Sequence, residues 1–161
     1  MKKIFITGAG GLIGSALTNV LGNLNYFIYA NDINFSYKIS KLENINILKF
    51  DLLLKNTFTK FSNVEIFIHN SAITKLSKFQ SNNLLNINIK LTKKALFLAK
   101  KMKAKKFFYI SSTSVYRNYK KSKYNERSKT LGRDPYSKSK LVSEKICREF
   151  CKKNKIKFSI L

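Results

Sequence analysis

The chain has few cysteines and no long apolar run, and both shortages exclude classes of protein. Cys147 and Cys151 are its only cysteines, four residues apart, without a second pair or a nearby histidine. That arrangement is not a zinc pattern, and reduced thiols in the cytoplasm are the default expectation. No segment approaches the roughly 18 apolar residues of a membrane span. The sequence therefore predicts no metal site, no membrane partner and a cytoplasmic location.

Acidic residues are also scarce, numbering 8 against 32 lysines and arginines, and the formal net charge is +24. Such a charge invites a nucleic-acid interpretation. The lysines are spread along the sequence rather than gathered in one block, however, so we attribute much of the charge to a chain-wide compositional bias. We do not expect nucleic acid as a partner, although a positive field would assist the capture of anionic ligands.

Apolar runs of strand length alternate with segments of helical periodicity. The strand-like runs are residues 4–6, 26–30, 45–50, 64–68, 107–110 and 156–161. Helical spacing predicts helices over residues 12–21, about 82–103 and from Pro135 to about Asn154, with Asp134 as the N-cap of the third. This alternation predicts one α/β domain over residues 1–161, a doubly wound parallel sheet with right-handed crossovers.

Three glycines at a fixed interval separate the first predicted strand from the first predicted helix. A chain that turns this sharply needs residues without a Cβ, and the same glycines let a pyrophosphate approach the free N–H groups of the helix. A glycine-rich turn without a ligand is the alternative. The expected phosphate contacts are residues of this turn and of the first helical turn: Gly8, Gly11, Leu12, Ile13 and Gly14.

Asp32 ends the second predicted strand, 24 residues after Gly8. A dinucleotide fold needs an acid near this position to accept hydrogen bonds from the ribose hydroxyls. Its carboxylate would repel a 2′-phosphate, which favours NAD over NADP, although Ser36 and Lys38 nearby could weaken that preference. An aspartate that only completes a strand-end turn is the alternative.

The spacing G-x-x-G-x-x-G, with Thr7 in front, resembles that of the short-chain dehydrogenase/reductase superfamily. It is most similar to the extended branch, the NAD-dependent epimerase/dehydratase family. The resemblance implies a Rossmann fold, NAD as cofactor and a nucleotide sugar as substrate. It also implies a homodimer through the two long helices, or a complementing C-terminal half, as a partner.

Further segments extend the resemblance to the cofactor site. Asp51 and Leu52 follow the third predicted strand, where the family has an Asp-hydrophobic pair at the adenine ring. Residues 70–72 follow the fourth predicted strand and resemble a family segment whose backbone passes under the cofactor. The members of that segment are Asn70, Ser71 and Ala72, with Ser71 in place of the usual first alanine.

Asn88 and Thr92 match the first and last places of the family pattern N-x-x-G-T, in which Leu91 here replaces the glycine. In the family this asparagine supports the active site, and we count Asn88 among the cofactor-site residues. An asparagine on the surface of a helix is the alternative. His69 is expected to be a packed structural histidine without a chemical role.

Ser112, Tyr136 and Lys140 are the predicted catalytic residues. Tyr136 to Lys140 resembles the family signature Y-x-x-S-K, and Ser112 lies 24 residues earlier, after the fifth predicted strand. A free tyrosine has a pKa of about 10, so we expect the Lys140 ammonium and the positive nicotinamide ring to stabilise the phenolate. Tyr136 would then take a proton from a sugar hydroxyl while hydride leaves for NAD, and Ser112 would position the substrate oxygen.

Other tyrosine–lysine pairs have the same spacing, so the spacing alone is weak. They are Tyr37/Lys41, Tyr116/Lys120 and Tyr119/Lys123. Only Tyr136 opens a capped amphipathic helix. Directly after Ser112, Thr113 and Ser114 replace the Asp-Glu pair that eliminates water in sugar-nucleotide 4,6-dehydratases. The resemblance therefore favours an epimerase or a simple oxidoreductase.

The resemblance covers the whole chain but only the cofactor half of the family pattern, so we expect the C-terminal substrate domain to be lacking. A fragment, a product of a split or decayed gene, and a half-size protein with a partner all fit. We expect weak or no catalysis by the chain alone and an exposed apolar edge. A non-catalytic NAD-binding remnant is the main alternative function, and a basic nucleic-acid-binding protein is a third.

Overall fold

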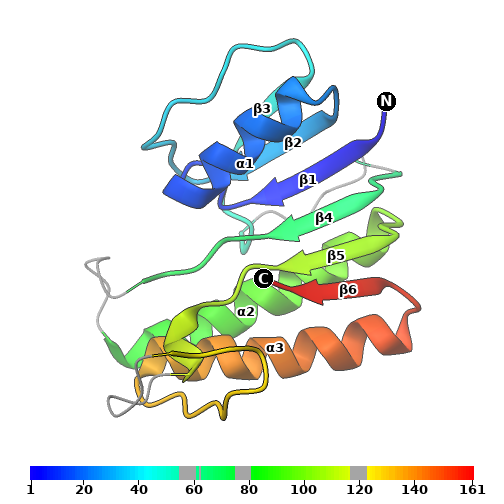
Figure 1. Ribbon diagram of the computed structural model, residues 1–161. Helices are drawn as coiled ribbons and strands as arrows, with labels where there is room; N and C mark the ends of the chain where they lie inside the picture. Colours follow the sequence, from blue (N-terminus) through cyan, green and yellow to red (C-terminus); the bar gives the residue numbers. More distant parts are fainter. Residues whose placement is uncertain (55–60, 62, 75–80, 117–122) are drawn as a thin grey trace.

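Six parallel strands form a single sheet in the computed structural model, which describes residues 1–54, 61, 63–74, 81–116 and 123–161 (Figure 1). The strands are β1 (Lys3–Thr7), β2 (Phe27–Asp32), β3 (Ile45–Lys49), β4 (Ile66–His69), β5 (Lys106–Tyr109) and β6 (Lys157–Ile160). Their order is β3-β2-β1-β4-β5-β6. This is the Rossmann order, which reverses between β1 and β4 and confirms the doubly wound parallel sheet.

Three helices of the described residues cover the sheet, with α2 and α3 side by side and α1 apart from them (Figure 1). They are α1 (Leu12–Asn23), α2 (Ser81–Lys101) and α3 (Pro135–Lys153), and a short 3-10 turn, η1 (Thr113–Tyr116), follows β5. The Asp134 side chain accepts hydrogen bonds from the backbone N–H groups of Tyr136 and Ser137, which confirms the predicted N-cap of α3. The first turn of α3, which carries Tyr136, is thereby fixed.

The core forms on both faces of the sheet because successive strand residues point to opposite sides. Phe5 stacks on Phe67 at 5.1 Å between ring centroids, and Phe67 stacks on Phe107 at 5.5 Å, on the side of α2 and α3. Each buried phenylalanine contributes about 1.5–3 kcal/mol by leaving water. Aliphatic residues pack on the α1 side: Ile4, Ile6, Ile28, Ala30 and Ile68.

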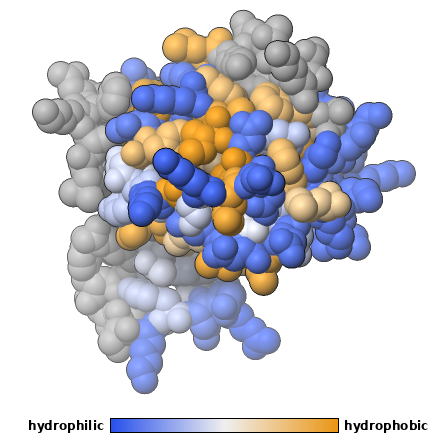
Figure 2. Space-filling view, turned by 90° about the horizontal axis from the view of Figure 1, so that it is seen from above, coloured by the Kyte–Doolittle hydropathy of each residue, from blue (hydrophilic) through white to orange (hydrophobic). Residues whose placement is uncertain are grey.

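Helix α1 has no charged residue, and part of its outer surface is apolar. Leu12, Ile13 and Val20 are more than half exposed, as is Leu24 at its C-cap. Figure 2 views the molecule from this side and shows hydrophobic residues gathered among hydrophilic ones. Among the helices described, none is long and apolar enough to cross a membrane.

The strand β6 lies at one edge of the sheet and follows the C-terminal end of α3. Phe158 and Ile160 pack against the core, whereas Leu161, just after the strand, is largely exposed. The sequence predicts an exposed apolar edge. At β6, the large apolar side chain that is mostly exposed is that of Leu161, just after the strand. Cys147 and Cys151 are free thiols buried on α3.

Candidate functional site

The glycine turn joins β1 to α1, and two of its glycines are required by the fold. Gly8 has a φ of +69°, and a Cβ there would lie 2.7 Å from the backbone nitrogen of Ser71. A Cβ on Gly14 would lie 2.0 Å from the carbonyl oxygen of Gly8. At Gly11, by contrast, a Cβ would meet only that same oxygen, at an ordinary 3.6 Å. The described chain therefore leaves open space beside Gly11.

The N-terminus of α1 adjoins this space. Gly11 is the N-cap, no side chain caps the helix, and the first turn has no acidic residue. Within the described residues, the first N–H groups of α1 therefore have no side-chain cap, and no acidic residue of the first turn neutralises the positive end of the helix. Together with the open space at Gly11, this geometry fits a pyrophosphate.

Gly10 is a residue of this site that sequence reasoning missed. Its N–H donates a hydrogen bond of 2.9 Å to Oδ2 of Asp32, and a Cβ on it would lie 1.9 Å from the carbonyl oxygen of Asn34. Gly10 thus holds the glycine turn against the end of β2. Its position two residues after Gly8 was the available signal in the sequence. The three-residue spacing of Gly8, Gly11 and Gly14 does not include it.

Asp32 lies where the sequence predicts, at the end of β2 beside the glycine turn. Besides Gly10, its carboxylate accepts hydrogen bonds from the N–H groups of Ile33, at 2.7 Å, and Asn34, at 3.4 Å. Asp32 therefore completes a strand-end turn, and its binding of a ribose stays a prediction. A carboxylate has about four acceptor sites, so a ribose hydroxyl can still bind to it.

The segment after β4 lies directly against the glycine turn. The Asn70 side-chain amide donates to the carbonyl oxygen of Gly8 at 3.0 Å. Oγ1 of Thr7 accepts from the N–H groups of Asn70, at 3.2 Å, and Ser71, at 3.3 Å. The backbone of residues 70–71 thus sits next to the predicted phosphate site. Ala72 continues this segment and is half-buried.

His69 is a packed structural residue, as the sequence indicates. Its Nδ1 lies 2.8 Å from Oγ1 of Thr7 and its Nε2 lies 3.2 Å from Oγ1 of Thr92. Because the Thr7 hydroxyl already accepts two N–H groups, its proton points to Nδ1, and the neutral ring carries its proton on Nε2. Burial, aided by the Lys140 charge, lowers the pKa of His69 to about 3.

Asn88 is buried on α2 and ties three parts of the fold together. Its Oδ1 accepts from the N–H of Ile73 at 2.8 Å, and its Nδ2 donates to the carbonyl oxygen of Ile73 at 3.0 Å and to Oγ of Ser139 at 3.1 Å. The surface-helix alternative is therefore wrong. Asn88 supports the site by joining the segment after β4 to α3.

Asp51 and Leu52 follow β3, but their side chains have different surroundings. Oδ1 of Asp51 accepts from the N–H of Leu53 at 2.7 Å, and the residue stays partly exposed. The side chain of Leu52 is buried in the main core. An adenine contact therefore stays a prediction for this pair, with Leu52 available chiefly through its backbone.

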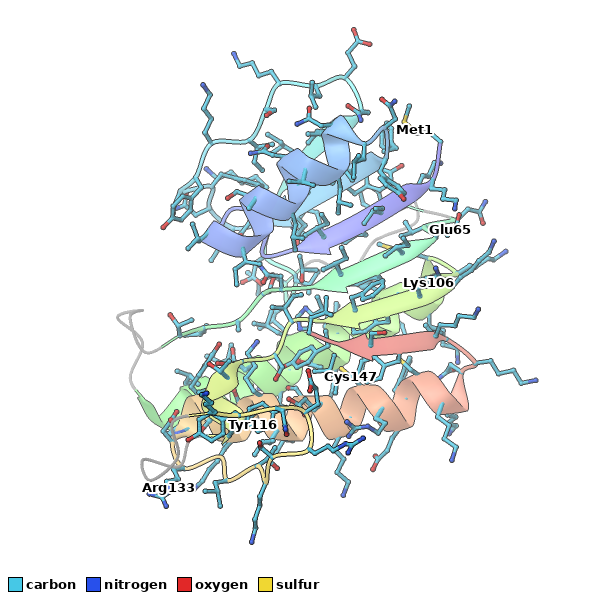
Figure 3. The ribbon with its side chains drawn as sticks, in the orientation of Figure 1. Met1, Glu65, Lys106, Tyr116, Arg133 and Cys147 are labelled. Carbon is cyan, nitrogen blue, oxygen red and sulfur yellow. The ribbon has the colours of Figure 1, made fainter. Side chains whose placement is uncertain are left out.

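The structure brings Ser112, Tyr136 and Lys140 together where β5 ends. Nζ of Lys140 donates to the carbonyl oxygen of Ile110 at 2.8 Å and lies 5.6 Å from the ring centroid of Tyr136. The Ser112 side chain is near enough to act on the Tyr136 phenol, whose pKa it lowers. Tyr116, labelled in Figure 3, ends the 3-10 turn beside this site, at the opposite end of the sheet from Glu65 and Lys106.

Burial dominates the electrostatics of the two catalytic candidates. Burial lowers the pKa of Lys140 to about 8, against the opposing influence of Cys147 and Glu144. Burial also raises the pKa of Tyr136, and the nearby Ser112 side chain only partly offsets this. In the chain without cofactor, burial therefore dominates the pKa of Tyr136, and the expected stabilisation of its phenolate by Lys140 together with a nicotinamide ring stays a prediction.

A second connection in the site was not predicted. The Ser111 hydroxyl donates to the carboxylate of Glu144, one helical turn after Lys140 on α3. It fixes the end of β5 to α3 beside Lys140.

The other tyrosine–lysine pairs with the same spacing do not form this site in the described residues. Tyr37 and Lys41 lie in the loop between β2 and β3, away from β5, whereas Lys120 and Tyr119 fall outside the described residues.

No three His, Cys, Asp or Glu side chains of the described ranges gather as metal ligands.

Comparison with known proteins identifies the family. Residues 4–161 match the NAD dependent epimerase/dehydratase family. The chain belongs to this family. It thus belongs with proteins that use NAD, and the sheet order and glycine turn described above fit that assignment.

Individual relatives agree with the family. The chain is 30% identical to dTDP-D-glucose 4,6-dehydratase of Dictyostelium discoideum over 187 residues, covering 97% of this chain and 42% of that protein. It is 28% identical to an uncharacterized UDP-glucose epimerase of Bacillus subtilis (strain 168), covering 92% and 51%. The chain spans about half the length of the curated relatives it matches.

A solved structure gives the same result. UDP-glucuronic acid 4-epimerase from Bacillus cereus, in complex with NAD, superimposes with a TM-score of 0.83 at 26% identity. The match covers 98% of this chain and 54% of that one. The family resemblance inferred from the glycine spacing is therefore confirmed, and the described fold corresponds to about half of that epimerase.

Proposed function

We propose that this chain forms the cofactor-binding half of an NAD-dependent sugar-nucleotide epimerase or oxidoreductase. The observation that carries the proposal is the convergence of Ser112, Tyr136 and Lys140 at the end of the sheet that also bears the glycine turn. Ligands bind at this end of a doubly wound sheet, where the strand order reverses.

The residues of the turn would hold the cofactor. The N–H groups at the start of α1 would bind the pyrophosphate beside Gly11, with Leu12 and Ile13 covering it. The remaining acceptor capacity of Asp32 would bind the ribose hydroxyls, and its charge would disfavour the 2′-phosphate of NADP. Residues 70–72 would pass beneath the cofactor.

NAD supplies the hydride acceptor in this proposal, and the protein supplies the proton transfer. The Tyr136 phenolate would take the proton of a sugar hydroxyl and become the phenol, and Ser112 would hold the sugar oxygen by a hydrogen bond. Lys140, fixed by the Ile110 carbonyl, keeps a positive charge near the phenol because its pKa of about 8 leaves it protonated at neutral pH. In an epimerase, hydride would return to the opposite face of the sugar carbon and Tyr136 would return the proton to the sugar oxygen.

Water elimination is not part of the proposal. Thr113 and Ser114 occupy the positions next to Ser112, and a hydroxyl is a far weaker acid and base than a carboxyl group near pH 7. The hydroxyl of Ser114 instead donates to Oγ of Ser112 at 2.9 Å. Its role in this proposal is to orient Ser112.

The partner is part of the proposal as well. A second copy packed on α2 and α3, or a polypeptide that supplies the substrate-binding half, would complete the protein. Phe97 on α2 and Val142 on α3 are both exposed by more than 40% of their surface, which suits a contact along these helices. Analytical ultracentrifugation tests the first of these partners.

Calorimetric titration with NAD and NADP, followed by an assay of UDP-sugar turnover, tests the function. We expect NAD to bind more tightly than NADP, and any turnover to be lost in Tyr136→Phe while NAD binding is retained. Lys145→Gln, at a largely exposed position on the same helix, is the control. Failure to bind NAD would refute the proposal, and equal turnover by Tyr136→Phe would refute its catalytic part.

A further inference from the structure

Two turns at the end of the sheet opposite the glycine turn repeat one lysine pattern. Residues 100–106 read K-K-M-K-A-K-K and residues 152–157 read K-K-N-K-I-K, so nine of these 13 residues are lysines. The whole chain has only 32 lysines and arginines in 161 residues. The fold therefore gathers a charge that appears evenly spread in the sequence.

Both turns have the same backbone geometry. The first connects α2 to β5 and the second connects α3 to β6, and β5 and β6 are paired neighbours. Lys103 and Lys155 occupy equivalent left-handed positions, with φ values of 57° and 54°. Glycine is the favoured residue at this position after a helix, so a lysine in both turns is not explained by backbone preference.

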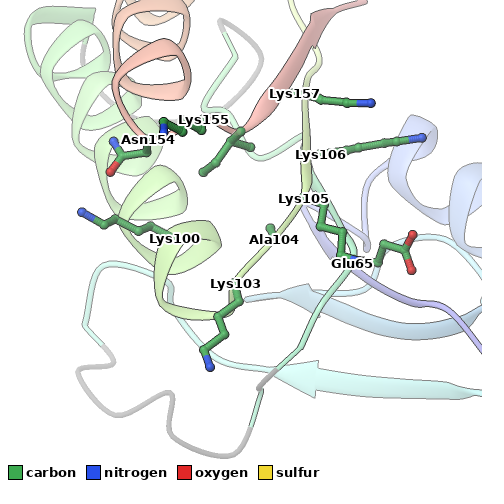
Figure 4. Close-up of a pocket in the computed structure, with 10 residues that line it drawn as sticks. Glu65, Lys100, Lys103, Ala104, Lys105, Lys106, Asn154, Lys155 and Lys157 are labelled. Carbon is green, nitrogen blue, oxygen red and sulfur yellow. The ribbon is translucent and has the colours of Figure 1, made fainter.

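The two turns border one hollow of about 560 Å³ (Figure 4). The charged residues that line it are Glu65, Lys100, Lys103, Lys105, Lys106, Lys155 and Lys157. Six lysines and one glutamate give a formal net charge of +5. A hollow of this volume has the size of a small-molecule site, and its charge selects for an anion with several negative charges.

One pair of lysines is placed where its charges destabilise the sheet. Lys106 on β5 lies directly opposite Lys157 on β6, and Figure 4 shows the two side chains running side by side in the same direction. Like charges at directly opposed positions destabilise a sheet. An anion bound between the two ammonium groups would convert this repulsion into attraction.

The lining narrows the chemical class of the ligand. Among the described residues that line it there is no aromatic ring on which a base could stack and no arginine for planar, bidentate recognition. Lysines act as point charges, so they recognise charge density rather than shape. We propose that this hollow binds a compact polyphosphate anion, at a site separate from the NAD-binding turn.

Calorimetric titration with inorganic tripolyphosphate at low salt tests the site. We expect Lys106→Gln/Lys157→Gln to bind the anion at least about tenfold more weakly than the unchanged chain. Lys90→Gln/Lys129→Gln removes the same charge from exposed lysines elsewhere and should change the affinity less than threefold. Equal losses in the two double variants would show a general charge effect and overturn the proposal.

Two further measurements separate this site from other anion sites. Gly11→Asp blocks the start of α1, so the tripolyphosphate binding that it retains belongs to the lysine-lined hollow, whereas complete loss of binding would place the anion at the glycine turn. Lys157→Gln should raise the melting temperature of the anion-free chain while it weakens binding. A lowered melting temperature, or an RNA oligonucleotide that displaces the anion and binds more tightly, would contradict the proposal.

Discussion

Substitution of Gly11 by aspartate is expected to stabilise the chain and to weaken NAD binding strongly. Gly11 has a φ of −80° and a ψ of 174°, which any residue adopts, and its Cβ would have room. Aspartate is a good N-cap, and its charge favours the positive helix end. These two effects add about 0.5–1 kcal/mol to the free energy of unfolding, or about 1–4 °C in melting temperature.

The same carboxylate would lie close to the pyrophosphate. Two like charges about 5 Å apart repel by roughly 3 kcal/mol at an effective dielectric constant of about 20. Since 1.4 kcal/mol is a factor of ten, the affinity for NAD should fall by about 100-fold. Calorimetric titration and thermal unfolding of the same preparation measure both effects.

Gly14→Ala is the contrasting variant. Its Cβ would lie 2.0 Å from the carbonyl oxygen of Gly8, and this backbone atom must move to make room. Overpacking of this kind costs about 1–3 kcal/mol, so stability and NAD binding should fall together. The reasoning is refuted if Gly11→Asp binds NAD within a few-fold of the unchanged chain, or if it melts several degrees lower.

Three further predictions concern buried polar residues. Asn88→Ala should lower the free energy of unfolding by about 2–4 kcal/mol in urea, because Ile73 and Ser139 lose their partner; the exposed Asn46→Ala should change it by less than about 0.5 kcal/mol. His69 is neutral in the fold with a pKa of about 3, so below pH 6.5 the unfolded chain binds the extra proton. The free energy of unfolding should then fall by up to about 1.4 kcal/mol per pH unit toward pH 3. A His69→Gln variant whose free energy of unfolding falls equally steeply with pH would contradict this. The pKa of Lys140 is about 8 in the fold, which is also below its value in the unfolded chain. Between pH 8 and 10 the unfolded chain therefore binds more protons at this lysine, so the free energy of unfolding should rise with pH. Urea denaturation of Lys140→Met at these pH values should lack that rise.

The fold was predictable because each strand and helix has a local signal. The runs of β-branched and aromatic residues gave all six strands, and the Asp134-Pro135 pair gave the start of α3. The boundaries differ by a few residues. Val64, for example, precedes β4 rather than belonging to it, and its N–H bonds to the carbonyl oxygen of Met102.

Much of the site was also predictable, because the strand ends that carry its residues meet at one edge of a parallel sheet. The missing parts depend on contacts between distant residues. The tie from Gly10 to Asp32 and the link from Ser111 to Glu144 have no sequence periodicity. The raised pKa of Tyr136 results from burial, which the spacing of Tyr136 and Lys140 does not reveal.

The central claim is that the glycine turn places NAD beside the phenol of Tyr136. A spectrophotometric titration of phenolate formation, with Tyr136→Phe subtracted, tests it directly. We expect the Tyr136 transition above pH 10 in the free chain, because burial raises its pKa, and at a lower pH with saturating NAD, whose nicotinamide ring is positive. A Tyr136 transition at the same pH with and without NAD would contradict the account.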